Sequence, residues 1–218
     1  MKNGCINLRI IYLGVLTFLF LVSGTVHATT LLNLSLEEMV ARSDSIVAGQ
    51  CVDIRTEWLD RKVYTIATIQ VGEVAKGTAA KGGSIEVYLL GGRVKKPIPI
   101  KMHVPGEATI KKGEEAVLFL ESGGSRKQLY RLVGMMQGKV PIANDPKTGM
   151  KIIVRQPAIK EVRIVDPDGD KSVMDRDQDL DRDRDLSGSC SLEGFLGRIQ
   201  QIVHEQKDEA VKQKGGAK

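Results

Sequence analysis

An aspartate-rich run near the C-terminal end carries the residues best suited to metal chemistry. Asp166, Asp168 and Asp170 match the first three acidic positions of a calcium loop, and Ca²⁺ prefers several hard oxygen ligands. The run departs from that loop because Gly169 stands at the fourth position rather than the sixth, and Asp177 replaces the bidentate glutamate at the twelfth. Two interpretations follow: a calcium site, or a solvated acidic tether with no cofactor.

Other groups suited to catalysis are scattered along the chain. The histidines after residue 28, His103 and His204, lack the paired spacing of metal ligands. No G-x-S-x-G turn presents a serine nucleophile. The carboxylates that could transfer protons lie on predicted strands: Asp53, Glu57, Glu73 and Glu86. Because strands often carry such solvated carboxylates, an enzyme is an alternative here and not the main prediction.

Anion binding is a second chemistry that the composition supports. Residues 93–112 hold six basic side chains and one acid, Glu107. Prolines in this connection limit the entropy lost when it is ordered. The candidate contact residues are Arg93, Lys95, Lys96, Lys101 and His103. They suit an acidic protein, a peptide or an envelope glycan, whereas the alternative is a solvated loop whose lysines aid solubility.

The cysteines after residue 28 could form a disulfide. Cys51 lies in a predicted strand, and Cys190 comes just before a predicted helix. An oxidising compartment permits such a bond. The alternative is a buried, apolar Cys51 and an unbonded Cys190, because the sequence alone does not place the two Cα atoms within bonding range.

The N-terminal residues predict export. Lys2 and Arg9 flank the start of an apolar run over Ile10 to Val22, and Val26-His27-Ala28 is a small-x-small cleavage site. We expect a signal peptide over residues 1–28, removed to leave a periplasmic or secreted protein with no stable membrane anchor. The remaining chain is only mildly basic and poor in aromatic residues, which argues against a nucleic-acid partner.

These groups need a scaffold, and the chain from 44 to 77 predicts its centre. Two segments rich in β-branched residues flank a polar turn at 59–62, which is the pattern of a long β-hairpin. Gly49 lies inside the first arm, where a bulge would bend the strand. Further strands are predicted at 84–90, 115–121, 129–133, 138–142 (an edge strand) and, last, 150–155, with an irregular connection at 93–113.

Two helices complete the predicted elements. Ser35 and Glu38 form a capping box that predicts a helix over 35–43. A C-terminal helix beginning at Ser191 is predicted from an apolar stripe: Leu192, Phe195, Leu196, Ile199, Ile202 and Val203. We expect this helix to dock on the strands, and the alternative is a helix that binds a membrane surface or a partner. The predicted organisation is a signal peptide (1–28), an OB-like β domain (29–156), an acidic disordered linker (157–188) and a C-terminal helix with a polar tail (189–218).

Several short motifs give the chain a resemblance to known proteins. They are Ser43-Asp44-Ser45-Ile46-Val47-Ala48-Gly49, Tyr64-Thr65, Val74-Ala75-Lys76-Gly77, Gly91-Gly92, Val104-Pro105-Gly106, Gly113-Glu114-Glu115 and Leu118-Phe119-Leu120. Through them, residues 35–142 resemble a group of exported bacterial proteins of unknown function and, more distantly, netrin-like modules such as the tissue inhibitors of metalloproteinases. The resemblance implies an OB-type barrel. Those inhibitors place an N-terminal cysteine on the zinc of their target, whereas this chain is predicted to begin at Thr29-Thr30 after cleavage.

The sequence therefore predicts a mainly β protein. Its fold class is a small antiparallel OB-like (netrin-like) barrel with a short N-terminal helix and a C-terminal amphipathic helix. The predicted function is that of an exported, non-enzymatic binding or interaction module. Two alternatives stay open: a secreted enzyme, such as a hydrolase, that uses strand or loop carboxylates, and a periplasmic protein similar to protease inhibitors.

Overall fold

The structure is a computed structural model that describes residues 29–59, 61–95, 99–123, 129–154, 162–165 and 191–215. For 29–31, 162–165 and 213–215 only the backbone is described. The signal peptide, Lys96, Cys190 and the aspartates of the proposed calcium loop (Asp166, Asp168 and Asp170) lie outside these residues. What the sequence predicts for them therefore stays a prediction.

The long hairpin is confirmed and forms the centre of a mainly β fold. Strands β2 (Ser45–Leu59) and β3 (Lys62–Lys76) pair antiparallel along their full length. The pairing register shifts between Ala48 and Gly49, as expected for a bulge. A Cβ atom at Gly49 would lie 2.5 Å from the backbone oxygen of Gln70 on β3. Glycine is therefore required here because the two backbones approach too closely for any side chain.

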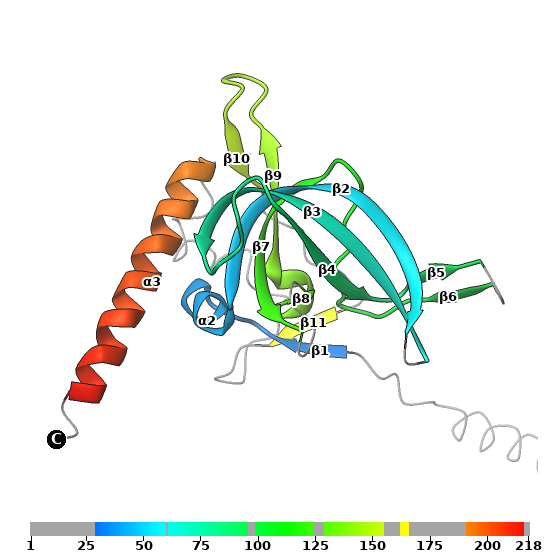
Figure 1. The fold of residues 1–218 in the computed structure, drawn as a ribbon, viewed down its shortest axis with the longest axis horizontal. Helices are drawn as coiled ribbons and strands as arrows, with labels where there is room; N and C mark the ends of the chain where they lie inside the picture. The colour runs from blue at the N-terminus through cyan, green and yellow to red at the C-terminus, as the bar shows by residue number, and fades with distance from the viewer. Residues whose placement is uncertain are drawn as a thin grey trace, which may run out of the picture.

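Seven strands build the main sheet, in the order β10-β9-β7-β2-β3-β4-β8 (Figure 1). The strands beyond the hairpin are β4 (Ser84–Leu90), β7 (Glu115–Ser122), β8 (Leu129–Leu132), β9 (Lys139–Asn144) and β10 (Lys151–Ile153). Strand β8 pairs with β4 in parallel and with β7 antiparallel. The sheet therefore curves enough for the short strand β8 to pair with both outer strands of the β7-β2-β3-β4 group.

The structure corrects several details of the prediction. The stretch 93–113 is not wholly irregular, because β5 (Gly92–Val94) and β6 (Ile100–Met102) pair as an antiparallel ribbon. Strand β9 is not an edge strand, since β10 pairs with its outer side. A 3₁₀ turn, η1 (Met135–Gly138), precedes β9. Strand β10 is also not the last strand: β11 (Val162–Val165) pairs in parallel with β1 (Thr29–Leu32), inside the range expected to be linker.

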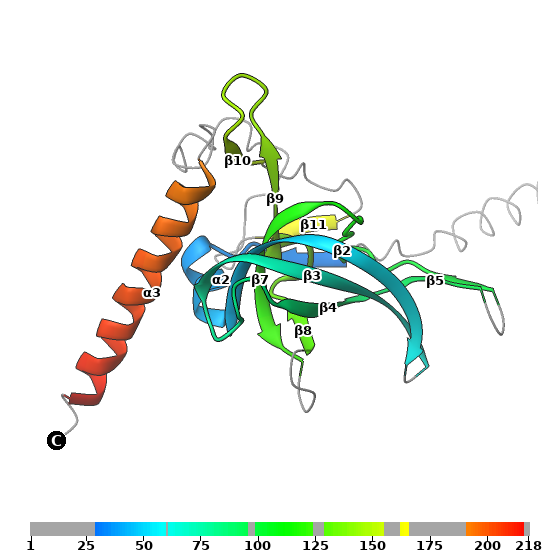
Figure 2. The ribbon, with the colours of Figure 1, turned by 45° about the horizontal axis from the view of Figure 1, so that its top comes forward.

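Both predicted helices are present. Helix α2 (Leu36–Arg42) carries the capping box: the Ser35 hydroxyl accepts from the Glu38 N–H, and the Glu38 carboxylate accepts from the Ser35 N–H. Helix α3 (Leu192–Gly215) lies beside α2, on the side of the molecule opposite the β5–β6 ribbon (Figures 1 and 2). Neither helix of the described chain is both long and apolar enough to cross a bilayer.

The buried residues form two clusters on opposite faces of the sheet. The first fills the concave side between β2, β3, β4, β7 and β8, where Val47, Val87 and Leu118 are almost wholly buried. The second lies between the sheet and the two helices, and it includes Phe119 and Ile199. Strand β7 contributes to both, so its run from Ala116 to Leu120 is buried on both faces. Strand β7 is therefore central in the fold, and the helix-side cluster shows that α3 docks on the strands, as expected.

Candidate functional site

The pairing of β5 with β6 gathers four of the five predicted contact residues on one face, whereas Lys96 lies outside the described residues. Arg93 stands opposite Lys101 in the register. Because side chains alternate along a strand, Lys95 shares the face of Arg93, and His103 shares that of Lys101. All four side chains are exposed. We call this pair of strands, with Lys95 and His103, the basic ribbon. Its other face is apolar and half-buried, with Val94 and Ile100 paired across the strands and Met102 beside them.

The base of the ribbon is fixed to β3. The Gly91 N–H donates to the Val63 carbonyl at 2.8 Å, and the Thr65 hydroxyl donates to the Gly91 carbonyl at 2.8 Å. Gly91 and Gly92 have φ angles of 111° and 134°, which favour glycine, and the chain bends there from β4 into β5. A Cβ atom at Gly92 would collide with the Thr65 hydroxyl, so the ribbon starts in close contact with the hairpin.

The single acid of the stretch 93–112 does not neutralise the ribbon. The Glu107 carboxylate accepts hydrogen bonds from the backbone N–H groups of Leu90 at 3.1 Å and Ala108 at 3.2 Å. Burial raises the pKa of Glu107, although these hydrogen bonds oppose the shift. Glu107 therefore holds the returning chain against the end of β4. No acidic side chain occurs between 92 and 106, so none of the exposed side chains described on the ribbon belongs to an acidic residue.

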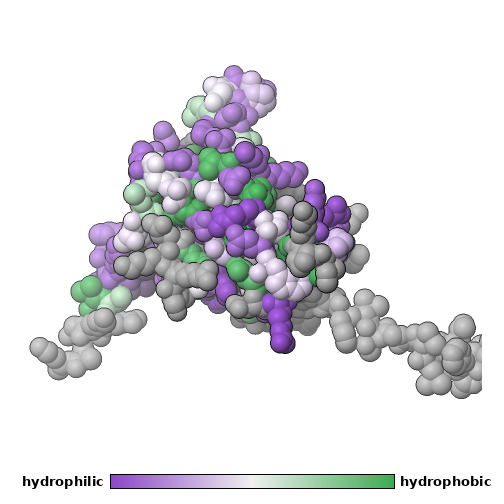
Figure 3. Space-filling model, turned by 45° about the vertical axis from the view of Figure 1, so that its right-hand side comes forward, coloured by the Kyte–Doolittle hydropathy of each residue, from purple (hydrophilic) through white to green (hydrophobic). Residues whose placement is uncertain are grey.

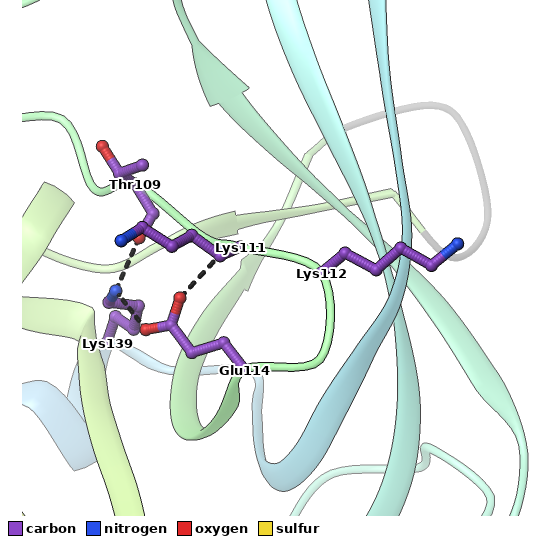
Figure 4. A pocket seen from close by; sticks show the side chains of 5 residues that line it. All are labelled: Thr109, Lys111, Lys112, Glu114 and Lys139. Atoms are coloured by element: carbon purple, nitrogen blue, oxygen red, sulfur yellow. Dashed lines mark hydrogen bonds and ion pairs between the residues drawn. The ribbon is translucent and has the colours of Figure 1, made fainter.

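A second basic feature is an open hollow of about 510 Å³ beside the start of β9 (Figure 4). Lys139 is nearly buried there: its Nζ donates to the Thr109 carbonyl at 2.5 Å and pairs with the Glu114 carboxylate at 2.7 Å. The other oxygen of Glu114 accepts from the Lys111 N–H at 2.8 Å. Lys112 points away from this group in Figure 4. The hollow is therefore organised around the ion pair between Lys139, at the start of β9, and Glu114, in the connection just before β7.

The strand carboxylates that could have served an enzyme are engaged in ion pairs. On the outer face of the hairpin, Arg55 pairs with Glu57 at 2.8 Å and reaches across β3 to Glu86 at 2.7 Å. The Tyr88 hydroxyl donates to Glu86 at 3.3 Å. The hydrogen bond from Arg55 lowers the pKa of Glu86, which is the opposite of what a general acid needs. Glu73 likewise pairs with Lys81 at 2.6 Å.

The arrangement of Arg55, Glu57, Glu86 and Tyr88 suits a role in stabilising the sheet. Arg55 and Tyr88 both stand opposite Ile66 in the strand register, and Ile66 is fully buried although it belongs to neither core cluster. The ion-paired side chains therefore cover an apolar residue on the outer face. Asp53, the remaining candidate, is exposed and lies 4.0 Å from Lys112.

The remaining predicted site residues in the described chain are Cys51 and His204. Cys51 is a buried free thiol whose Sγ donates to the Asp53 carbonyl at 3.4 Å, and burial raises its pKa. A bond to Cys190 stays a prediction because that residue is outside the described chain. His204 is exposed and lies 3.6 Å from Asp208 on α3. Within the described ranges, no cluster of three histidine, cysteine or carboxylate side chains could hold a metal ion.

Sequence analysis missed one set of residues near the ribbon. The Cβ position of Gly92 faces Thr56 and Thr65, so the ribbon starts beside the outer half of the hairpin. The tip of that hairpin and the ribbon both project from the same end of the molecule (Figures 1 and 2). The tip carries Trp58, whose surface is 47% exposed, and two exposed cations, Arg61 and Lys62. The four-residue turn was visible in the sequence, but its position beside the ribbon was not.

Comparison with known proteins does not assign this chain to a family. No protein-family model matches this chain, and no curated protein matches it either.

Proposed function

We propose that this protein is an exported, non-enzymatic binding module that contacts an acidic partner through the basic ribbon. The observation that carries the proposal is the strand register, which sets Arg93 opposite Lys101 with Lys95 and His103 at alternating positions. Three exposed cations, Arg93, Lys95 and Lys101, on a stretch of sequence without acidic residues attract negative charge and give fast, salt-sensitive association. Acidic proteins, acidic peptides, anionic envelope glycans and anionic lipid headgroups share this chemistry.

We further propose that β2, β3, β4, β7 and β8 form an OB-like barrel that serves as the rigid base of the ribbon. The pairing of β8 with both β4 and β7 supports this reading. A rigid base matters because binding then orders only a few side chains. The proposal that the protein is exported rests on its N-terminal sequence. Export to an oxidising compartment would permit a disulfide between Cys51 and Cys190.

The binding function is preferred over an enzyme for a specific reason. The strand carboxylates Glu57, Glu73 and Glu86 are each tied to a cation. The pKa of Glu86 is shifted down, whereas an acid catalyst at neutral pH needs a raised pKa. These observations favour a structural role for the carboxylates.

The test compares two variants of equal charge change. The ribbon variant is Arg93→Gln, Lys95→Gln and Lys101→Gln, and the control is Lys147→Gln, Lys207→Gln and Lys212→Gln, three exposed lysines elsewhere. Both should melt within a few degrees of the wild type, because exposed substitutions change stability by about 0.5 kcal/mol or less each. The tagged mature wild type and the control should capture the same proteins or glycans from a native envelope extract. Equal capture by the ribbon variant would contradict the proposal.

A further inference from the structure

The ribbon end of the molecule combines cations with an exposed indole. Trp58 is the only tryptophan of the chain and is 47% exposed near the tip of the β2–β3 hairpin. It stands opposite Val63, which is almost fully buried, so its backbone position is fixed by the strand register. An exposed tryptophan on a rigid strand presents a large apolar ring with a polar N–H. Such side chains concentrate at the interface between lipid headgroups and acyl chains.

The charge around Trp58 is predominantly positive. Arg61 and Lys62 are exposed at the turn, beside the acid Asp60 of the sequence. The basic ribbon adds Arg93, Lys95 and Lys101 at the same end of the molecule. The nearest described acid on β2, Glu57, is already paired with Arg55 at 2.8 Å. The end therefore offers a net excess of unneutralised cations together with one interfacial aromatic ring.

The apolar residues at this end are few and dispersed. Val94, Ile100 and Met102 on the other ribbon face are half-buried, and Figure 3, which turns this side of the molecule forward, shows hydrophobic residues scattered among hydrophilic ones. A stable protein–protein interface normally has a compact apolar centre. A charged surface with one half-exposed indole suits a lipid surface better, because electrostatic attraction brings the protein to the headgroups and the ring inserts shallowly.

We infer that this end of the molecule docks reversibly on an anionic phospholipid membrane, with Trp58 in the headgroup region. The inference rests on the proposed binding function and names the acidic partner of the basic ribbon. Each cation near an anionic bilayer adds a modest attraction that decays within a Debye length, about 8 Å at physiological salt. Docking is therefore peripheral and salt-sensitive, and it needs no membrane-spanning helix.

The test uses the mature chain and the fluorescence of Trp58. Vesicles of phosphatidylglycerol mixed with phosphatidylcholine should shift the emission of Trp58 to the blue, whereas pure phosphatidylcholine should not. Raising the salt from about 0.05 M to about 0.5 M should reverse the shift, because the Debye length shortens. The ribbon variant should partition onto anionic vesicles at least about tenfold more weakly than the wild type, and the Lys147/Lys207/Lys212 control should match the wild type.

A second measurement separates the ring from the charges. Vesicle sedimentation of Trp58→Ser should show several-fold weaker binding to anionic vesicles, while its binding to a soluble poly-glutamate peptide should equal that of the wild type. Ribbon-dependent binding to poly-glutamate without sedimentation on anionic vesicles would overturn the membrane inference and leave the proposed function standing. Absence of ribbon-dependent binding to vesicles, to poly-glutamate and to the envelope extract would overturn both.

Discussion

Replacing Ile199 by alanine should destabilise the protein, because this residue fixes α3 to the sheet. Ile199 is fully buried in the helix-side cluster, which also holds Val40, Ile46 and Phe119. Truncation of a buried isoleucine to alanine removes three carbon atoms and leaves a cavity, which costs about 2–5 kcal/mol. For a domain of this size each kcal/mol lowers the melting temperature by roughly 2–4 °C, so the expected decrease is about 4–20 °C.

The assay is urea unfolding of the mature protein with matched substitutions on the same helix. Ile199→Val should cost only about 0.5–1.5 kcal/mol, giving a graded series. Val211→Ala is the control, because Val211 is 69% exposed and its change should stay within about 0.5 kcal/mol. If α3 unfolds separately, Ile199→Ala should instead speed proteolysis within 192–215. The reasoning is refuted if Ile199→Ala has the unfolding curve and the protease resistance of Val211→Ala.

Three further predictions concern the ion pairs and the N-terminus. The pKa of Glu86 is lowered from 4.5 by Arg55, so this pair stabilises the fold above pH 4.5 and the stabilisation is lost as pH falls through the lowered value. Glu86→Gln should therefore unfold less steeply with falling pH than the wild type, and an unchanged pH profile would oppose this assignment. Lys139→Met should lower the free energy of unfolding, measured by chemical denaturation, by about 1–3 kcal/mol, because the partly buried Glu114 carboxylate then lacks its cation. Combining Lys139→Met with Glu114→Leu should recover part of that stability. Protein recovered from the envelope should begin at Thr29 in N-terminal sequencing, and a start at Met1 would contradict signal cleavage.

Local patterns in the sequence predicted the elements whose formation depends on neighbouring residues. The capping box at Ser35 and Glu38 specifies a helix start within four residues, and the structure has both hydrogen bonds. The hairpin was predictable because its two arms and turn are contiguous in sequence. The apolar stripe of α3 likewise predicted its buried face, since Phe195 and Ile199 lie in the helix-side core.

Pairings between distant or very short segments were not predictable. Strand β11 pairs with β1 across more than a hundred residues, and its four residues stand directly before the aspartate-rich run. The ribbon escaped prediction because β5 and β6 have three residues each and Pro97 and Pro99 lie between them. Prolines argue against strands locally, yet they are tolerated in the connection where no ladder hydrogen bond is needed.

The sequence therefore predicted the residues of the site but not their arrangement. Residue types alone identified Arg93, Lys95 and Lys101 as candidates, but composition does not say whether cations spread around a loop or share a face. The antiparallel register of the ribbon supplies that information. The sequence did not single out Trp58, because its place beside the ribbon depends on contacts between β5 and the hairpin.

Chemical footprinting of lysines tests the role of the basic ribbon most directly. The mature protein would be acetylated briefly with and without the captured envelope fraction, and the modified lysines would be quantified by mass spectrometry. Lys95 and Lys101 are both exposed, as are the reference residues Lys147 and Lys212. We predict that the bound fraction protects Lys95 and Lys101 several-fold relative to Lys147 and Lys212. Unaltered acetylation of Lys95 and Lys101 in the bound complex, with protection at other lysines, would contradict the assignment of the ribbon as the binding site.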